Sequence, residues 1–300
     1  MKRTLFNSPQ KQWLRQFFWL PAIEHFKGES NQELRYLTFA GPEGYDIEFF
    51  TGRQVFKLEN IRVWENRADA ASALQAKFGV DFQVKTGEAF NLSKAAQERQ
   101  FFPHNVINLD FTSGAFQLSQ PRFIPHKFEI ISNIIAAQRE HTQSFMLLLA
   151  FAAGADVDSD HGRAFVHKTA FDIATRFGFT EPLFNLTRSP DKTYAQTLAA
   201  VIPCAVIRLG GEHFYDTRCL GKALYLPYNS KKTAMLCFNF RLTYDNPALS
   251  EPDLQGSGRM NEVIVRRQQE ALGLELRNVN ALMKRSSLRV PGRRVRSRAK

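Results

Sequence analysis

The sequence predicts a doubly wound α/β fold, with a mostly parallel sheet and an antiparallel pair of strands near the C-terminus. Between Tyr36 and Phe177, short apolar runs alternate with stretches whose apolar residues recur at helical spacing. This alternation is typical of right-handed βαβ crossovers, which place strands in parallel. From about Ala199 the strand candidates follow one another with only turns between them, which indicates antiparallel pairing.

Four strand candidates in the first half of the chain carry polar or glycine-rich residues at or near their ends. They are Tyr36 to Ala40 before Gly41-Pro42-Glu43-Gly44, Ile61 to Trp64 before Glu65, Asp81 to Lys85 before Thr86-Gly87-Glu88, and Val106 to Phe111, which contains Asn108 and Asp110. Short helices are expected at 45–52 and 68–78. Because ligands of open α/β sheets bind outside the carboxyl ends of the strands, we expect these segments to converge on one crevice.

The second half continues the pattern and then departs from it. Helical spacing predicts helices over 127–143 and 161–177, on either side of a buried strand from Phe145 to Ala153. Cys204 to Leu209, Lys222 to Leu226 and Ala234 to Thr243 are the later strand candidates. The predicted organisation is a basic, aromatic N-terminal segment (1–35), a Rossmann-like domain (36–245), a linker with a C-terminal helix from about 260 to 283 (246–283), and a basic disordered tail (284–300).

Charge is concentrated at the C-terminal end. The formal net charge is +11, yet residues 284–300 hold eight of the 40 basic residues and no acidic residue, so the remainder carries 32 − 29 = +3. A cluster of this kind is typical of a solvated tail, and it also makes nucleic acid a candidate partner because it could bind phosphates. The sequence leaves both interpretations open.

Several classes of protein are disfavoured. The longest apolar run, Phe145 to Ala153, is too short to cross a bilayer, and four basic residues interrupt the first twenty positions, so we expect a cytoplasmic protein without a membrane partner. The three cysteines lack the spacing of a zinc site, and no GxSxG or P-loop pattern is present. Asp156, Asp158 and Asp160 resemble the start of a calcium loop, but His161 stands where glycine is required, so Asp160 is expected to cap a helix.

With these motifs in place, residues 36–245 resemble the class I S-adenosylmethionine-dependent methyltransferases. In that family, five alternating strand and helix units are followed by an antiparallel pair, as predicted here. The resemblance implies S-adenosylmethionine as cofactor, with Gly41 and Gly44 against its methionine part, Glu65 at its ribose, and Gly87 and Glu88 at its adenine. It also implies that Asn108 and Asp110 lie beside the transferred methyl group, as catalytic residues, with Asp110 also contacting the cofactor.

The first motif departs from the family pattern, which shows an acid followed by GxGxG. Here Pro42 follows Gly41 and has no amide hydrogen to offer a ligand. Two functions therefore remain open: a methyltransferase, with nucleic acid as a candidate acceptor, or a non-catalytic nucleic-acid- or protein-binding protein on a degenerate methyltransferase scaffold. Glu65 is likewise either the ribose ligand or a surface acid at a strand end. The acceptor and the oligomeric state are not predicted.

Overall fold

A computed structural model describes residues 7–30, 33–87, 103–116, 126–141, 143–154, 158–178, 190–227, 234–245 and 256–287. Its central element is one sheet with eight described strands in the order β3-β2-β1-β4-β5-β7-β6-β8. The strands are β1 (Tyr36–Thr38), β2 (Ile61–Glu65), β3 (Gln83–Thr86), β4 (Val106–Gly114), β5 (Phe145–Ala152), β6 (Tyr215–Tyr225), β7 (Met235–Tyr244) and β8 (Leu276–Asn278). The pairs among β1 to β5 are parallel, and β7 runs antiparallel to both β5 and β6.

This topology confirms the predicted fold class. The first three strands run outward in the order 1-2-3, and the fourth returns to the other side of β1, so the strand order reverses between β1 and β4. Tyr36 of β1 is level with Val106 of β4, and Thr38 with Asn108. In open α/β sheets the ligand crevice lies where the order reverses. The crevice is therefore expected above Thr38 and Asn108.

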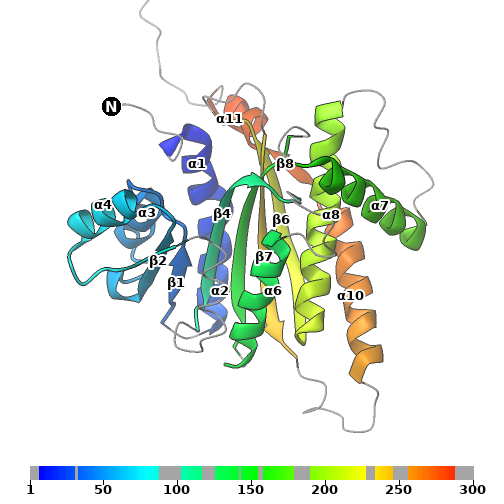
Figure 1. Cartoon of the computed structure of the whole chain (residues 1–300), viewed down its shortest axis with the longest axis horizontal. Helices are drawn as coiled ribbons and strands as arrows, with labels where there is room; N and C mark the ends of the chain where they lie inside the picture. The colour runs from blue at the N-terminus through cyan, green and yellow to red at the C-terminus, as the bar shows by residue number, and fades with distance from the viewer. Residues whose placement is uncertain are drawn as a thin grey trace, which may run out of the picture.

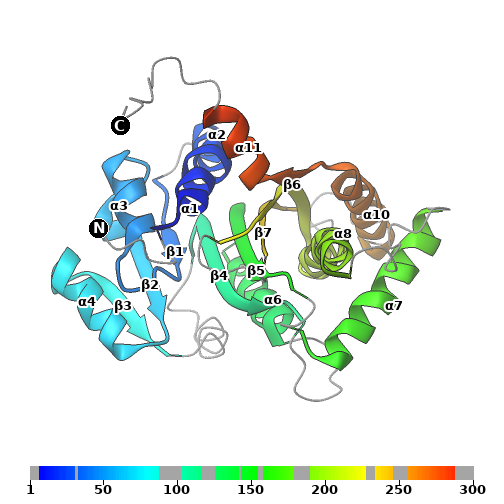
Figure 2. The same cartoon turned by 90° about the horizontal axis from the view of Figure 1, so that it is seen from above.

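Helices cover both faces of the sheet (Figures 1 and 2). One face carries α1 (Pro9–Leu14), a π-helical turn (Arg15–Trp19), α2 (Leu20–Ser30), α3 (Tyr45–Gly52) and α11 (Val279–Ser287). The other carries α6 (His126–Arg139), α7 (Asp160–Phe177), α8 (Pro190–Glu212) and α10 (Gly256–Gly273). Helix α4 (Ala68–Phe78) and the 3-10 turn Leu58–Asn60 belong to the β2 and β3 end of the sheet.

Strand residues alternate between two apolar cores. Tyr36 packs with the N-terminal helices, whereas its neighbour Leu37 packs with α6. On β5, Leu148 and Leu149 divide in the same way, and the whole strand is buried. A strand buried on both faces reads as a continuous apolar run, which is why Phe145 to Ala153 was recognisable in the sequence.

The run from Cys204 to Leu209, predicted as a strand, is helical. It lies inside α8, which continues through Pro203 and packs against β6 and α10. A short apolar run does not distinguish a buried strand from the buried part of a helix. Burial of α8 between the sheet and α10 explains why its apolar residues show no clear helical period.

The C-terminal boundaries also differ from the prediction. The expected helix from 260 to 283 ends at Gly273, and the chain then adds β8 to the sheet edge, parallel to β6, before α11 begins. Lys284 and Arg285, assigned to the tail, belong to the last turn of α11. Cations there are favoured by the negative end of the helix dipole.

Among the described residues, one helical stretch, Tyr194–Glu212, is long and apolar enough to span a membrane, and 83% of its most apolar window is buried inside the protein. A core helix of a soluble protein meets the same criterion. This stretch is the part of α8 that packs on the sheet.

His104 makes the stability of the fold dependent on pH. It is 1% exposed, and burial together with the charges of Arg62 and Arg35 lowers its pKa to about 3. An unfolded histidine titrates near 6.5, so between these values the unfolded chain binds a proton that the folded chain does not. Stability is therefore lost as the pH falls below about 6.5, and the loss from His104 reaches about 2 kcal/mol at pH 5.

We predict that His104→Gln removes this part of the pH dependence. Urea unfolding at pH 7 and pH 5 should show a difference in unfolding free energy that is about 2 kcal/mol smaller in the variant than in wild type. The exposed residue His161 provides the control, and His161→Gln should behave as wild type. An equal loss in wild type and His104→Gln would contradict the assignment.

Candidate functional site

The turn after β1 is built by two glycines in the left-handed region. Gly41 has φ +63° and Gly44 has φ +59°, and the Gly44 amide donates to the Gly41 carbonyl at 3.2 Å. A Cβ on Gly44 would lie 2.6 Å from Cε2 of Phe78 on α4. Gly44 is thus required by backbone conformation and by packing against α4, and the space beside its Cα is filled by the protein.

Glu65 lies at the end of β2, as predicted, and is 8% exposed. Its Oε1 accepts the Arg67 amide at 3.1 Å, and in the described part of the chain Oε2 accepts no hydrogen bond. The two oxygens of a carboxylate can together accept about four hydrogen bonds, so the Glu65 carboxylate can also accept one from a ligand hydroxyl. The hydrogen bond from the Arg67 amide also agrees with the alternative interpretation, in which Glu65 is an acid that starts the turn after the strand.

Gly87 lies directly beside Glu65. Its amide donates to the Glu65 carbonyl at 3.0 Å, and its own carbonyl accepts from Nε1 of Trp64 at 2.8 Å. The turns after β2 and β3 therefore meet, as the sequence predicted. Glu88, the other predicted adenine contact, lies outside the described residues.

Asp110 is paired with a residue of the N-terminal segment. Lys11 of α1 forms an ion pair with its Oδ2, and the two side chains are 7% and 11% exposed. The ammonium also lies 5.5 Å from the ring centroid of Trp19 and 6.0 Å from that of Tyr225. Burial opposes the charge of Lys11, but Asp110 and the neighbouring groups outweigh it and raise the pKa of Lys11.

A second buried ion pair lies next to the first. Arg15 contacts Asp46 in the first turn of α3, and these side chains are 5% and 7% exposed. Asn108, which is fully buried, donates through Nδ2 to the Tyr36 hydroxyl at 3.0 Å and more weakly to Asp46 at 3.5 Å. Its Oδ1 and the Thr38 hydroxyl have no hydrogen-bond partner among the described residues.

The predicted site residues therefore divide into two groups. Glu65, Gly87 and the Gly41 turn lie at the ends of the neighbouring strands β2, β3 and β1, and no described residue donates a hydrogen bond to Oε2 of Glu65. Asn108 and Asp110 lie at the predicted strand but beneath α1, where Lys11 neutralises Asp110. Neither side chain is accessible to an acceptor in this conformation.

Polar groups missed by the sequence analysis lie past the ends of β4 and β5. Lys127 of α6 donates to Ser113 Oγ at 2.6 Å and to the Gly114 carbonyl, and burial lowers its pKa to about 8 despite the nearby charge of Asp158. Asp158 accepts from the Phe116 amide at 2.9 Å and from the Tyr194 hydroxyl at 2.6 Å. Burial raises the pKa of Asp158.

The role of the acidic loop differs from the prediction. Ser159, not Asp160, caps α7, because its side chain accepts the Gly162 amide. Asp160 is the first helical residue and pairs with Arg163. Within the described ranges, no group of three His, Cys, Asp or Glu side chains could hold a metal ion.

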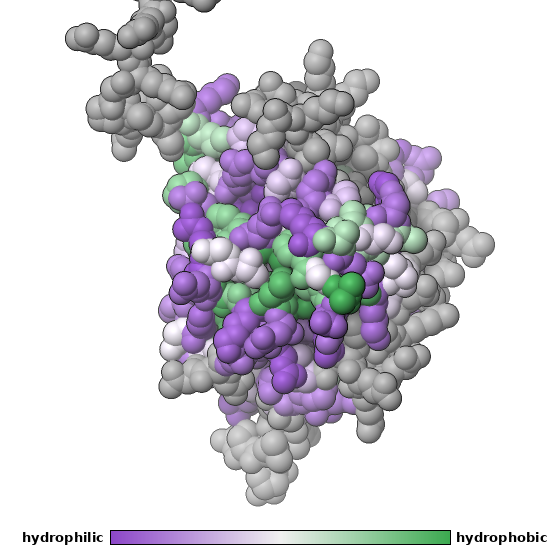
Figure 3. Space-filling model, turned by 90° about the vertical axis from the view of Figure 1, so that its left-hand side faces the viewer, coloured by the Kyte–Doolittle hydropathy of each residue, from purple (hydrophilic) through white to green (hydrophobic). Residues whose placement is uncertain are grey.

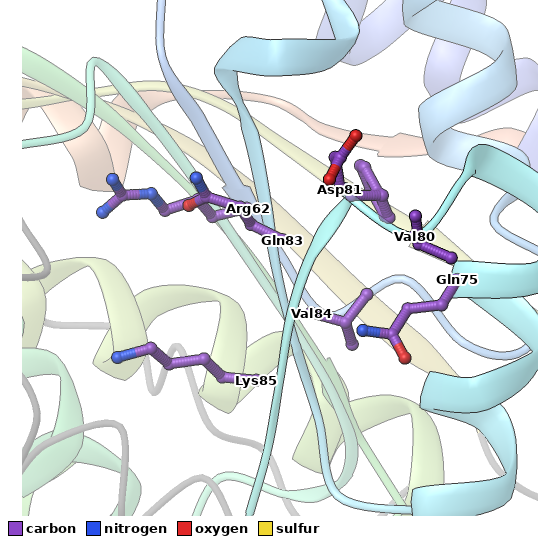
Figure 4. Close-up of a pocket in the computed structure, with 8 residues that line it drawn as sticks. Arg62, Gln75, Val80, Asp81, Gln83, Val84 and Lys85 are labelled. Carbon is purple, nitrogen blue, oxygen red and sulfur yellow. The ribbon is translucent and has the colours of Figure 1, made fainter.

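A cavity of about 430 Å³ lies along the β3 edge, away from the strand ends (Figure 4). Arg62, Gln83 and Lys85 project to one side of the edge strand, and Gln75 and Val84 lie on the other. This side of the molecule shows hydrophobic surface enclosed by hydrophilic residues, and Val80 at this edge is 88% exposed (Figure 3). Since Gly87 lies past the carboxyl end of β3, this cavity is distinct from the predicted cofactor crevice.

Lys11 and Arg15 were not identified from the sequence because nothing in it links the N-terminal segment to the strand ends. A signal was present: the two cations are four residues apart, which places them on one side of a helix. Acidic partners at Asp46 and Asp110 become recognisable only when the helix is docked on the sheet.

We predict strong energetic coupling between Lys11 and Asp110. Removing one partner of a buried ion pair leaves an uncompensated charge and costs about 3 to 5 kcal/mol, whereas replacing both with apolar residues is often close to neutral. Lys11→Met and Asp110→Leu should each lower the unfolding free energy by about that amount in urea titrations, and the double variant should recover most of it.

The exposed pair Arg67 and Asp69 is the matched control, with side chains 62% and 69% exposed. A double-mutant cycle there, with Arg67→Gln and Asp69→Asn, should give a coupling energy far smaller than that of the buried pair, because solvent screens exposed charges. Equal coupling energies for the two pairs would show that the ion pair between Lys11 and Asp110 is exposed to solvent in solution.

Comparison with known proteins adds distant structural neighbours. No protein-family model matches the sequence, and no curated protein matches it. Similar solved structures include an rRNA methylase from Streptococcus thermophilus, with 12% identity over 75% of this chain and 96% of that chain and a TM-score of 0.39. A SAM-dependent methyltransferase from Methanosarcina mazei has 13% identity over 75% of this chain and 98% of that chain, with a TM-score of 0.36. An O-methyltransferase family protein from Burkholderia thailandensis has 10% identity over 79% of this chain and 57% of that chain, with a TM-score of 0.35.

These TM-scores are too low to carry an argument, so the fold assignment rests on the strand order. Five parallel strands in the order 3-2-1-4-5 are followed by the antiparallel β7 and then β6, which agrees with the predicted succession of strand and helix units and an antiparallel pair. The chain has a doubly wound α/β fold.

Proposed function

We propose that the chain binds S-adenosylmethionine and transfers its methyl group to an acceptor. The observation that supports this proposal is Glu65 at the end of β2, beside the Gly41 turn and Gly87, where no described residue donates a hydrogen bond to its Oε2. In nucleotide-binding α/β units, an acid in this position accepts hydrogen bonds from ribose hydroxyls.

The cofactor, when bound, supplies an electrophilic methyl group. Glu65 would hold the ribose, and the turns containing Gly41 and Gly87 would border the methionine and adenine parts. The side-chain oxygen Oδ1 of Asn108 has no partner among the described residues and can accept a hydrogen bond from an acceptor amine, which would orient the nitrogen lone pair. Positioning of two bound reactants would supply most of the rate.

Access to Asn108 and Asp110 requires α1 to move. Both side chains lie under the helix, and Lys11 and Arg15 hold it there through buried ion pairs. Catalysis in the proposed form therefore needs a second conformation in which Asp110 is released from Lys11.

The same ion pair favours a second candidate function, a non-catalytic binding protein on a methyltransferase scaffold. If α1 stays in place, an acceptor cannot reach Asn108 and Asp110, even if the cofactor binds beside Glu65. Measurement of cofactor binding and of methyl transfer separates the two functions.

We predict that isothermal titration detects binding of S-adenosylmethionine and S-adenosylhomocysteine to wild type, and that Glu65→Gln weakens both by roughly tenfold or more. Loss of a charge-assisted hydrogen bond is worth about 1.5 to 3 kcal/mol, which corresponds to that range. Glu59→Gln is the control, because Glu59 is an exposed acid just before β2.

Absence of binding heat in wild type would reject both the cofactor and the enzyme. Binding that is unchanged in Glu65→Gln would reject only the role of Glu65. Binding without transfer to any RNA, DNA or protein substrate would support the non-catalytic alternative.

We further propose nucleic acid as the acceptor class. The C-terminal segment 288–300 carries six basic residues and no acid, and it follows α11, whose last turn adds Lys284 and Arg285. Phosphate contacts by such a segment would provide affinity without sequence choice.

We predict that deletion of 288–300, which leaves α11 intact, weakens binding to single-stranded RNA and flattens its salt dependence. Each phosphate contact contributes about 0.7 to the slope of log K against log salt for single strands, so the slope should fall by up to about 4. A variant with the same 13 residues in scrambled order should bind as wild type. An unchanged slope after deletion would contradict the proposal.

A further inference from the structure

A cavity of about 600 Å³ lies among α6, α7, α8 and α10, on the face of the sheet opposite α1 (Figures 1 and 2). Phe116, just past β4, and Phe128 of α6 are buried at its floor, and Phe165 of α7 forms part of its wall. Asp110 belongs to the other face of β4, since its neighbour Phe111 packs with Phe128 in the α6-side core. The cavity is therefore separate from the predicted cofactor crevice.

The rim of the cavity is charged. Lys168 and Arg176 project from α7 and are exposed, and in the described part of the chain neither forms an ion pair within 4 Å. Asp172 lies between them on the same helix, whereas Arg208 of α8 is matched by Glu212 at 3.1 Å. Two unpaired cations against one acid give the α7 side of the rim a net positive charge.

A polar group at the wall is left without a partner. Gln268 of α10 is 5% exposed and donates through Nε2 to the Cys204 carbonyl at 3.0 Å, while its Oε1 has no hydrogen-bond partner among the described residues. A buried acceptor without a partner costs free energy. An N–H or O–H group on a ligand that reached this wall would remove the cost.

We propose that this cavity binds a small amphipathic anion with an aromatic body, one acidic group and a hydrogen-bond donor. Three phenylalanines match the aromatic body, Lys168 and Arg176 match the acidic group, and Gln268 matches the donor. The volume falls within the range of small-molecule sites, which run from about 300 to 1,000 Å³. A folded protein partner or a nucleic-acid duplex is too large for it.

Because Phe116 forms the floor, a ligand here would touch the segment that follows β4. The Phe116 carbonyl lies 1.8 Å from where a Cβ on Gly162 would stand, so α7 packs tightly on this segment. The proposal does not depend on cofactor binding or on methyl transfer.

The test uses two fluorescent probes that differ in charge. 8-Anilinonaphthalene-1-sulfonate has two aromatic groups, a sulfonate and one N–H, and N-phenyl-1-naphthylamine has the same body without the sulfonate. We expect wild type to bind the sulfonate at least fivefold more tightly than the neutral probe. We expect Lys168→Gln/Arg176→Gln to reduce sulfonate affinity by about fivefold, because two exposed cations attract an anion only through a solvent-screened interaction, while the neutral probe binds as before.

Two further variants locate the probes. Thr169→Trp narrows the cavity at its rim and should weaken binding of both probes, while Arg266→Gln on the exposed side of α10 should leave both unchanged. Circular dichroism and urea unfolding of each variant identify any that fail to fold, in which case Ala205→Leu replaces Thr169→Trp. Equal affinity for the two probes, or unchanged affinity in the narrowed cavity, would overturn the proposal.

Discussion

Two buried ion pairs at the point where the strand order reverses hold the N-terminal helix on the sheet. Lys11 pairs with Asp110 of β4, and Arg15 pairs with Asp46 of α3, so α1 is bound to the two elements that flank the crevice. Desolvation makes each of these charges costly, and each is tolerated only because its partner is present. The position of α1, the closure over Asn108 and the burial of Asp110 all depend on these two contacts.

The consequence for function is a division of the crevice. On its proposed nucleoside side, no described residue forms a salt bridge with Glu65, whereas on its proposed acceptor side Lys11 pairs with Asp110. The π-helical turn Arg15–Trp19 directly follows α1, and such turns are frequent at functional sites. Helix α11, whose last turn carries Lys284 and Arg285, packs against α1, the helix that covers Asp110. The proposed acceptor site and the basic turn of α11 thus belong to the same face of the sheet.

The other face is built differently. Burial is the main cause of the pKa shifts of Lys127 and Asp158. Asp158 accepts hydrogen bonds from the Phe116 amide and the Tyr194 hydroxyl. Phe116 also lines the cavity among α6, α7, α8 and α10. A ligand at that cavity and a ligand in the crevice would lie on opposite sides of β4. Strand β4 lies between them; it pairs with β1 up to Asn108, and with β5 up to Asp110 and again at Gly114.

Local pattern in the sequence determined the fold class, the parallel strands and the turns at Gly41, Glu65 and Gly87, because apolar periodicity and turn residues act within a few positions of the chain. It did not determine α8, where burial on several sides removed the helical period and made Cys204 to Leu209 resemble a strand. It also did not place β8, whose three residues are a strand only because the edge of β6 is there to pair with. Tertiary structure alone decided which acid is neutralised: Oδ2 of Asp110 pairs with a cation 99 residues earlier in the chain, whereas no described residue donates a hydrogen bond to Oε2 of Glu65.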